Sequence, residues 1–293
     1  MKKIVTTNSY CRAVFGEKLY KLTLSAATSC PNRERGAGCI FCSAGGSGEF
    51  AAPAQLAIEE QIQFAKARIR DKYKGNHFIA YFQSYTGTYG DLERLERIYL
   101  TAAAREDIAA VSIATRPDCL GERAMEMLRR IARVKPLWVE LGLQTQSDRT
   151  ARLIHRGYPY IEYERAVAKL RTLDAHIITH IILGLPDEDK EQMLASVRAA
   201  AISDGIKLQL LHILKGTQLE QWYNEGRCPV MCAEEYYELV ADALETLPEG
   251  TVVHRMTGDG DKRLLVAPLW CADKKRVIND LHKVLQNRGF ILE

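Results

Sequence analysis

The chain has 293 residues, which is enough for one large domain or two small ones, and it is 47% hydrophobic and 26% charged, as expected of an ordinary folded protein. Its formal net charge of +3 is too small to argue for or against a nucleic-acid partner. No run of eighteen apolar residues is present and the first residues lack the apolar core of a signal peptide. We therefore expect no membrane partner and, with eight cysteines, a reducing cytoplasmic location.

Alternating apolar residues over 19–25 predict a first strand, which leads directly into a loop that holds Cys30, Cys39 and Cys42. Eight residues separate the first two cysteines, and two separate the last pair. Soft thiolates from a glycine-containing loop can hold an iron–sulfur cluster. A cluster that only carries electrons takes four protein cysteines. Three cysteines would leave one iron open, where a small molecule can bind and be cleaved.

Other interpretations of this loop stay open. A structural zinc site would need a fourth ligand, and the nearest candidate, Cys11, lies well upstream. A disulfide with one spare thiol is a further alternative, although nothing indicates an oxidising compartment. Phe41 beside the last cysteine and the Gly-Gly-Ser-Gly that follows favour the cluster. Cys228 and Cys232 could form half of a second metal site, but no second pair has a matching spacing.

A regular alternation of helix and strand follows the cysteine loop. Helical periodicity is expected at residues 58–69, from residue 92 onward, and at 124–131, 166–173 and 193–200. Five further strands are expected at residues 77–83, 108–114, 137–143, 177–183 and 208–214. Six strands that alternate with helices indicate parallel βαβ units with right-handed crossovers. Because eight units are needed to close a barrel, the expected α/β fold is an open, partial (β/α)6 barrel of the TIM type.

The pattern changes after residue 217. A helix is expected around residues 236–244, a strand at 251–256, and a closing amphipathic helix that carries Val277, Leu281 and Val284. We expect residues 1–217 to form the barrel core and residues 218–293 to form a C-terminal α/β extension that closes its open side. No Pro- or Ser-rich linker separates the two parts, so one continuous domain is predicted.

Polar residues and glycines follow every predicted strand of the core. They are Cys30 and the segments 83–87, 115–118, 144–145, 184–186 and 215–217. Because the carboxyl ends of parallel strands meet at one edge of a sheet, these segments should converge there. The convergence is a stronger indication of a functional site than any single motif.

A cysteine triad after the first strand of a partial barrel, with an aromatic residue before the last cysteine, resembles the radical S-adenosylmethionine (SAM) superfamily. Most members separate the first two cysteines by three residues, and this chain departs from that pattern. With its Cys-Pro-Asn-Arg and Gly-Cys-Ile-Phe-Cys-Ser blocks, the chain is instead similar to the YhcC/YtqA-like family, a distant relative of the Elongator catalytic subunit. The similarity extends over the blocks at residues 15–18, 81–83, 115–118, 140–145, 182–186, 211–217 and 257–260.

The resemblance implies a set of cofactor contacts. Cys30, Cys39 and Cys42 would bind three irons of a 4Fe-4S cluster, and SAM would chelate the fourth iron through its amino and carboxylate groups. Phe41 would lie near the adenine of SAM. Gln83 and the segment 84–87, which begins with Ser84, would lie near the SAM amino group.

Four further cofactor contacts are expected from the resemblance. Gln144 and Arg156 match a pair that contacts the ribose and carboxylate of SAM in the oxygen-independent coproporphyrinogen oxidases, and arginine suits a carboxylate because its charged fork is planar. The bland alternatives are a satisfied polar residue at a strand end for Gln144 and a surface helix residue for Arg156. His180 stands where those enzymes carry an acidic residue, which puts its ribose contact in doubt. Leu214, at the end of the sixth strand, completes the set.

The implied chemistry is one-electron reduction of the SAM sulfonium, which gives methionine and a 5′-deoxyadenosyl radical that abstracts hydrogen from a substrate. An electron donor such as ferredoxin or flavodoxin is an expected partner. Cys119 is a candidate hydrogen donor. His212 and Lys215 are the other two candidate catalytic residues. Candidates for contact with the substrate are these two residues together with His254, Arg255, Asp259 and Asp261.

Three functions remain open from the sequence. The first is a radical enzyme that modifies transfer RNA (tRNA), which kinship with the Elongator subunit suggests. The second is a radical enzyme that acts on a small metabolite or peptide, and the third is a non-catalytic iron–sulfur sensor. The sequence does not name the substrate.

Overall fold

The computed structural model describes residues 1–46, 48, 50–73, 75–258 and 260–293. Within these residues the main sheet has nine strands, in the order β11-β1-β9-β7-β6-β5-β4-β3-β2, and all neighbouring pairs are parallel. Its strands are β1 (Lys2–Thr6), β2 (Tyr20–Leu24), β3 (Phe78–Phe82), β4 (Ile108–Thr115), β5 (Leu137–Gln144), β6 (Ala175–Leu183), β7 (Gly205–Leu210), β9 (Val252–Arg255) and β11 (Phe290–Leu292).

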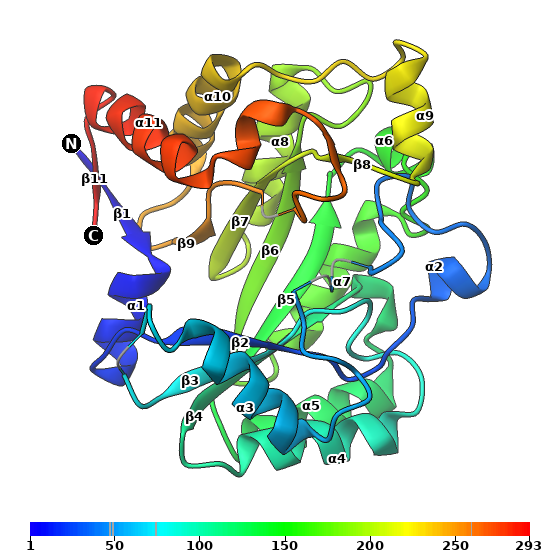
Figure 1. The fold of residues 1–293 in the computed structure, drawn as a ribbon, viewed down its shortest axis with the longest axis vertical. Coiled ribbons are helices and arrows are strands. Elements are labelled where there is room, and N and C mark those ends of the chain that lie inside the picture. Colours follow the sequence, from blue (N-terminus) through cyan, green and yellow to red (C-terminus); the bar gives the residue numbers. More distant parts are fainter. Residues whose placement is uncertain (47, 49, 74, 259) are drawn as a thin grey trace.

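The six strands from β2 to β7 lie side by side in chain order, which confirms the predicted parallel α/β arrangement. A helix follows each of the first five, and these helices lie against the outer face of the curved sheet (Figure 1). They are α3 (Ile58–Ile69), α4 (Leu92–Ala103), α5 (Glu122–Ala132), α7 (Tyr160–Leu170) and α8 (Lys190–Ala200). Each helix buries an apolar stripe in the core, with Ile62, Leu95 and Leu128 fully covered. Burial of each such side chain contributes about 2 kcal/mol.

Helix starts are set by local capping. The Asp91 carboxylate accepts hydrogen bonds from the N–H groups of Glu93 and Arg94, both at 3.1 Å, and so begins α4. Asp189 and Gln192 form a reciprocal capping box that begins α8. These contacts satisfy N–H groups that a helix leaves unpaired in its first turn.

Two parts of the core differ from the sequence prediction. The apolar run 208–214 is not one strand: β7 ends at Leu210, and β8 (Ile213–Leu214) pairs antiparallel with β10 (Leu265–Ala267) in a separate two-stranded sheet. The run looks continuous because β7 and β8 both bury apolar residues, although against different partners. Three short helices follow strands β2, β5 and β8 at positions where none was predicted: α2 (Pro31–Glu34), α6 (Asp148–Leu153) and α9 (Gln218–Asn224).

The N-terminal residues and the C-terminal residues share one end of the sheet. β1 lies between β9 and β11 and is followed by α1 (Thr7–Phe15), where the sequence indicated no regular element. Helices α10 (Ala233–Thr246) and α11 (Lys274–Asn287) pack on this part, and the two termini lie close together (Figure 1). The C-terminal residues thus add strands on the β7 side of the sheet. Closure of the barrel by this extension, and a boundary at residue 217, stay predictions.

Among the described residues, no helix is long and apolar enough to cross a membrane.

Candidate functional site

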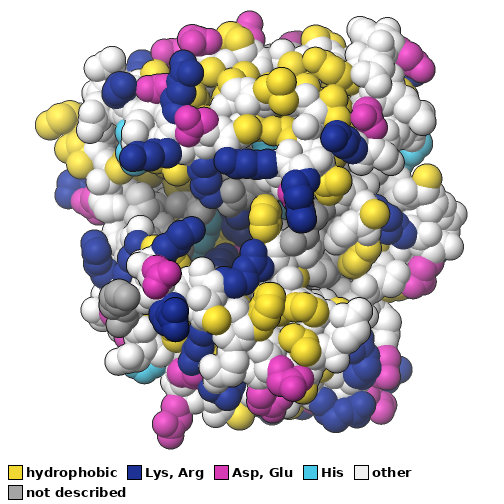
Figure 2. Space-filling model, in the orientation of Figure 1, with side chains coloured by type: hydrophobic (Ala, Val, Ile, Leu, Met, Phe, Trp, Pro, Cys, Tyr) yellow, Lys and Arg dark blue, Asp and Glu magenta, His cyan; other side chains and the backbone are white. Residues whose placement is uncertain are grey.

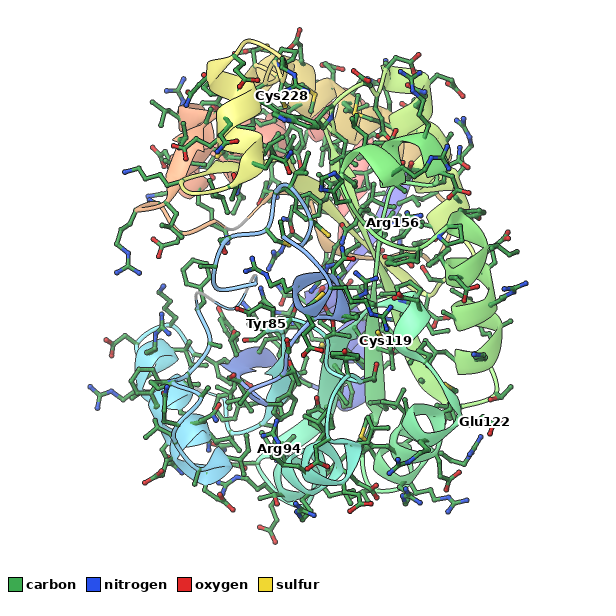
Figure 3. All side chains as sticks on the ribbon, turned by 90° about the vertical axis from the view of Figure 1, so that its right-hand side faces the viewer. Tyr85, Arg94, Cys119, Glu122, Arg156 and Cys228 are labelled. Carbon is green, nitrogen blue, oxygen red and sulfur yellow. The ribbon has the colours of Figure 1, made fainter. Side chains whose placement is uncertain are left out.

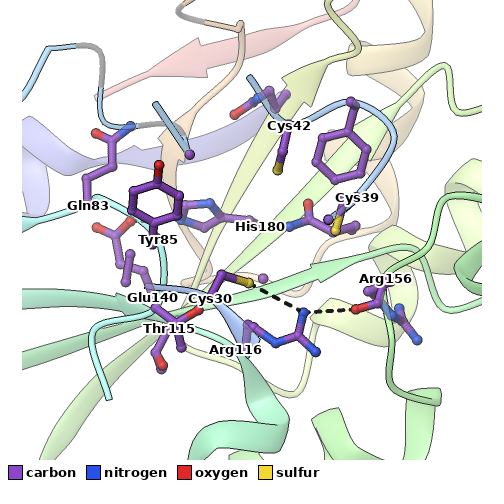
Figure 4. Close-up of a pocket in the computed structure, with 18 of the residues that line it drawn as sticks. Cys30, Cys39, Cys42, Gln83, Tyr85, Thr115, Arg116, Glu140, Arg156 and His180 are labelled. Atoms are coloured by element: carbon purple, nitrogen blue, oxygen red, sulfur yellow. Dashed lines mark hydrogen bonds and ion pairs between the residues drawn. The ribbon is translucent and has the colours of Figure 1, made fainter. Parts of the chain in front are cut away.

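The three cysteines of the loop after β2 face one cavity (Figure 4). Cys30 begins α2, and its main-chain oxygen accepts the N–H groups of Arg33 at 2.9 Å and Glu34 at 3.1 Å. Cys39 and Cys42 follow in a tight turn, in which the Cys42 N–H donates to the Cys39 oxygen at 3.1 Å. All three are free thiols.

Side chains from α2 hold the second half of the loop in place. Asn32 donates from Nδ2 to the Cys39 sulfur at 3.4 Å and to the main-chain oxygen of Arg156 at 3.1 Å. Arg33 donates from Nη2 to the main-chain oxygen of Cys42 at 3.1 Å. The loop is therefore tied both to itself and to the segment that follows α6.

The cavity lies at the carboxyl ends of the strands and has a volume of about 950 Å³, open solvent at its mouth included. Its lining residues come from the cysteine loop, from six strands or strand ends, and from the segment after α6. They include Cys30, Cys39, Phe41, Cys42, Tyr81, Gln83, Arg116, Glu140, Gln144, Arg156, Tyr158, His180, Gln209 and Arg255.

The electrostatic setting of the thiols suits sulfur ligands. Arg116 Nη1 lies 3.9 Å from the Cys30 sulfur. The hydrogen bond from the Cys42 thiol, aided by Asn32 and Arg116, lowers the pKa of Cys39 to about 7, although burial opposes this effect. The same contact, together with burial, raises the pKa of Cys42 well above its usual value. Thiolate is the form that binds metal, and nearby cations favour it. Three cysteines on an open cavity, with cationic neighbours, fit a cluster that leaves one iron accessible.

The alternatives for the loop find less support. Cys11 is fully buried in a separate apolar cluster with Leu19 and Trp138, so it does not supply a fourth ligand for zinc. All eight cysteines are free thiols, so none of them forms a disulfide in this structure. Within the described residues, no group of three or more His, Cys, Asp or Glu side chains, the three loop cysteines included, is placed to hold a single metal ion such as zinc, whereas a cluster spreads its thiolate ligands over several irons.

Four of the predicted SAM-binding residues line the cavity together with Phe41 and the cysteines, namely Gln83, Gln144, Arg156 and His180. Gln144 has a φ of +68°, and at this point the pairing of β5 with β6 shifts register. The end of β5 is therefore irregular where it lines the cavity with the cysteine loop. The individual contacts of these residues with SAM stay predictions.

Arg156 is buried, with 1% of its side chain exposed, and is not a surface helix residue. Its guanidinium donates to the main-chain oxygens of Leu143 at 2.7 Å, of Thr145, and of Tyr158 at 3.1 and 2.9 Å. It also stacks on the Tyr158 ring at 4.5 Å. Arg156 thus fixes the end of β5, on which Gln144 lies.

Ser84, Leu214 and His212 lie beside this cavity. Ser84 is not among the described lining residues, and its main-chain oxygen accepts a hydrogen bond from Thr28 at 2.8 Å. Leu214 and His212 line an adjoining cavity, which shares Phe41, Gln83 and His180 with the first and also includes Asp261 and Arg255. The two cavities form one continuous hollow in the described part of the chain.

Three candidates lie outside this hollow. Lys215 is exposed, and its N–H pairs with the Leu264 oxygen because β8 turns toward β10. Cys119 lies 3.8 Å from Asp118 Oδ1, and burial raises its pKa to about 12. His254 contacts His176 at 2.9 Å and Thr7, the first residue of α1, at 3.1 Å.

The candidates that remain are Asp259, Cys228 and Cys232. Asp259 lies outside the described residues. Cys228 is buried in an apolar cluster with Leu219 and Trp222, far from Tyr85 at the cavity (Figure 3). Cys232 is exposed and caps α10. The structure therefore gives Cys228 and Cys232 no joint site.

Sequence reasoning missed a charged group inside the sheet. The Glu140 carboxylate is fully buried: Oε1 accepts from Lys21 at 2.5 Å and Ser112 at 2.8 Å, and Oε2 accepts from His180 at 2.8 Å and from Lys207. Although burial opposes it, Lys207 and Lys21 hold the pKa of Glu140 well below its usual value. The sequence did contain a signal for this group: three largely apolar strands each carry one charged residue, which is Lys21 in β2, Glu140 in β5 and Lys207 in β7.

His180 stands where the resemblance implies an acidic residue, and it pairs with the Glu140 carboxylate. Burial, together with Lys207, lowers the pKa of His180 to about 4, so its imidazole is neutral near pH 7. A neutral imidazole donates one hydrogen bond and accepts another. Here the interaction with Glu140 uses Nε2.

A parallel barrel with three cysteines after β2 and polar strand ends around one cavity defines a protein that binds a sulfur-ligated cluster. A model of the Radical SAM superfamily matches residues 25–200, and a model of the Radical_SAM C-terminal domain matches residues 203–287. The chain belongs to the radical SAM superfamily and, within it, to the YhcC/YtqA-like family. Its cofactors are accordingly a 4Fe-4S cluster and SAM.

Similarity to individual proteins extends over most of the chain. The YtqA protein of Bacillus subtilis is 40% identical over 293 residues, which cover 98% of this chain and 91% of that protein. A tRNA uridine(34) acetyltransferase of Dehalococcoides mccartyi is 30% identical over 175 residues, 58% of this chain and 37% of that protein. The solved structure of Elp3 from the archaeon Methanocaldococcus infernus superposes with a TM-score of 0.69 at 15% identity, over 92% of this chain and 63% of that chain. This last similarity shows the fold alone.

Proposed function

We propose that this protein is a radical SAM enzyme that modifies a nucleoside of tRNA. The observation that carries the radical chemistry is the convergence of Cys30, Cys39 and Cys42 with Gln83 and Gln144 on one open cavity. When bound, the reduced cluster and SAM supply a 5′-deoxyadenosyl radical that abstracts hydrogen from the substrate. The partial match to a tRNA uridine(34) acetyltransferase supports tRNA as the substrate.

The chain's own residues position the reactants and exclude water. Asn32 and Arg33 hold the cysteine loop, and Arg156 fixes the end of β5 that carries Gln144. Phe41 and Tyr158 line the cavity with aromatic surface, which shields a reactive intermediate from solvent. A ferredoxin or flavodoxin is the proposed electron donor.

A cationic groove beside the cavity also supports an RNA substrate. Figure 2 shows Lys and Arg side chains around a hollow on the face of the molecule that is turned to the viewer in Figures 1 and 2. The groove shares His212 and Asp261 with the adjoining cavity, and its cations are Arg68, Lys262, Lys274 and Arg263, of which Arg263 is paired with Asp261 at 2.6 Å. Cations spaced along a groove can contact the phosphates of a nucleic acid.

Nucleoside analysis of tRNA tests the proposal. Total tRNA is isolated from a strain that lacks the gene, and from the same strain complemented with the wild type or with Cys39→Ala, and is then compared by liquid chromatography and mass spectrometry. We expect one modified nucleoside to be lost and its precursor to accumulate, with rescue by the wild type alone. An unchanged nucleoside profile would remove tRNA as the substrate and favour a small metabolite or peptide.

A further inference from the structure

Arg116 follows β4 directly, and its side chain points toward Cys30 at the wall of the cluster cavity (Figure 4). Nη1 lies 3.9 Å from the Cys30 sulfur, within reach of a long N–H···S hydrogen bond, and it donates to the main-chain oxygen of Arg156 at 2.9 Å. This nitrogen carries two hydrogens, so it can serve both acceptors. Only 12% of the Arg116 side chain is exposed, so solvent ions screen its charge weakly.

Two neighbours hold the guanidinium of Arg116 in this position. Asp118 accepts hydrogen bonds from Nε at 2.9 Å and from Nη2 at 2.8 Å, which makes a bidentate pair. The ring of Tyr158 lies against the guanidinium, with its centroid 4.9 Å from Cζ. Because the pair with Asp118 uses one edge of the planar fork, Nη1 is fixed on the opposite side, where the Cys30 sulfur lies.

The ion pair with Asp118 weakens the positive charge of Arg116 but gives it a direction. The carboxylate lies beside Nε and Nη2, whereas Nη1 is the nitrogen that faces the sulfur of Cys30. The pair is therefore a dipole whose positive end is turned toward Cys30. Arginine stays protonated throughout the pH range in which proteins are folded, so this end keeps its charge.

A positive end beside a cluster ligand changes how easily the cluster is reduced. Reduction adds one negative charge, and both hydrogen bonds to the sulfurs and nearby positive charge favour the reduced form. The effect is larger where the surroundings exclude water, because the interaction is then less screened. A role as a structural brace accounts for the contact of Arg116 with the Arg156 oxygen, but it does not require a charged donor at Cys30.

We infer that Arg116 raises the reduction potential of the cluster by donating an N–H group to Cys30 and by turning the positive end of its pair with Asp118 toward that sulfur. Uptake of one electron from a low-potential donor is thereby made easier. Arg116 acts through Cys30 and is a positioning residue. The inference goes beyond the proposed function because it holds for any substrate, and it rests on Cys30 as a ligand of the cluster.

A redox titration of the reconstituted protein under anaerobic conditions tests the inference. SAM and RNA are left out, dithionite and mediator dyes set the solution potential, and electron paramagnetic resonance measures the reduced cluster. At one fixed potential, we expect the ratio of reduced to oxidised cluster to be about 10-fold lower in Arg116→Gln than in the wild type, which is about 59 mV for a one-electron couple. Arg123→Gln is the control, because 78% of the Arg123 side chain is exposed, and it should leave the ratio unchanged.

Asp118→Asn should shift the ratio in the opposite direction. It removes the negative end of the dipole, while the amide oxygen still accepts one hydrogen bond from the guanidinium and keeps its orientation. The ratio of reduced to oxidised cluster should therefore rise. Arg116→Gln and Asp118→Asn break the same contact, so a purely structural role predicts shifts of the same sign or none.

Iron and sulfide content per chain shows whether each variant is assembled, and if Arg116→Gln is not, the sign of the shift in Asp118→Asn decides. An unchanged ratio in an assembled Arg116→Gln variant, or a lowered ratio in Asp118→Asn, would overturn the inference. Because no RNA is present, these results are independent of whether tRNA is the substrate. A wild-type chain that assembles no cluster would overturn the inference and the proposed function together.

Discussion

Arg116 donates a hydrogen bond from Nη1 to the main-chain oxygen of Arg156, 2.9 Å away (Figure 4). The contact joins the end of β4 to the segment between α6 and α7. The same nitrogen lies 3.9 Å from the sulfur of Cys30, so the contact also directs a cation toward the first cysteine. Asn32 reaches the same Arg156 oxygen at 3.1 Å, which brings the cysteine loop to this point.

Gly157 leaves room for Asn32, and its replacement should weaken the cluster site. Gly157 has a φ of +86°, and a Cβ at this position would overlap the Asn32 side chain. Because Asn32 donates to the Cys39 sulfur, Gly157→Ala should lower cluster affinity by about 10-fold, as for other residues that support a metal ligand. The measurement is iron and sulfide content per chain after reconstitution and desalting.

Gly216→Ala is the matched control for this prediction. Gly216 has a similar φ of +75°, but a Cβ there would meet nothing within 4 Å. It carries the same backbone strain without the clash. Equal cluster content in the two variants would show that the position of Asn32 does not matter for the cluster.

Arg156→Lys should destabilise the protein. The guanidinium serves the carbonyls of Leu143, Thr145 and Tyr158 together, and a lysine ammonium cannot reach all three. We expect the free energy of unfolding to fall by about 2 kcal/mol, because buried carbonyls lose charged donors. Urea denaturation measures this change, with the exposed Arg152→Lys as the control. A loss no greater than that of Arg152→Lys would contradict the bracing role.

Glu140→Ala should destabilise the protein more strongly. It leaves the buried Lys207 and the half-buried Lys21 without their carboxylate, and breaking the buried pair with Lys207 costs about 4 kcal/mol. The double variant Glu140→Ala/Lys207→Met removes one of the stranded charges and should regain part of that loss. Urea denaturation compares both with the exposed control Glu249→Ala. A double variant no more stable than Glu140→Ala would contradict the charge argument.

Asp107 should stabilise the fold at neutral pH and lose this effect in acid. Hydrogen bonds from Arg105, together with Lys66, lower the pKa of Asp107 to about 2, although burial opposes this. The pKa in the unfolded chain is about 3.9, so the stabilisation is complete above that pH and disappears as the pH falls toward 2. Asp107→Asn should therefore lower the free energy of unfolding by about 2 kcal/mol at pH 7 and by less at pH 3.

Urea denaturation of the cluster-free protein between pH 7 and pH 3 measures this dependence. Asp71→Asn is the control, because 93% of the Asp71 side chain is exposed. A constant difference between wild type and Asp107→Asn across this pH range would show that the Asp107 charge does not contribute.

Local periodicity was enough to predict β2 to β6, part of β7 and the five longer helices between them, because each buries its own apolar stripe. It could not predict β1 and β11, since Lys2 pairs with Phe290 and neither strand has a clear pattern of its own. The partner that makes each of them a strand lies at the other end of the chain. The break at Leu211–His212 was likewise hidden, because both sides of it are apolar.

The site was predictable where it follows from strand ends. Gln83 and Gln144 line the cavity with the cysteines because parallel strands bring their carboxyl ends together, whereas Phe41 and His180 were expected there from the family resemblance alone. The buried contacts of Glu140 with Lys21 and Lys207 were not predicted, since a charge within a strand normally faces solvent. Lys215 lies just past a strand end as well, but β8 pairs with β10 and leaves it exposed.

The central claim is that Cys30, Cys39 and Cys42 hold a cluster that cleaves SAM. The direct measurement is anaerobic reconstitution with iron and sulfide, reduction with dithionite in the presence of SAM, and chromatography for 5′-deoxyadenosine. We expect this product from the wild type and from Cys232→Ala, whose cysteine is exposed elsewhere, but not from the Cys30/Cys39/Cys42→Ala triple variant. A fully assembled cluster that yields no 5′-deoxyadenosine, even with tRNA from the deletion strain, would contradict the claim.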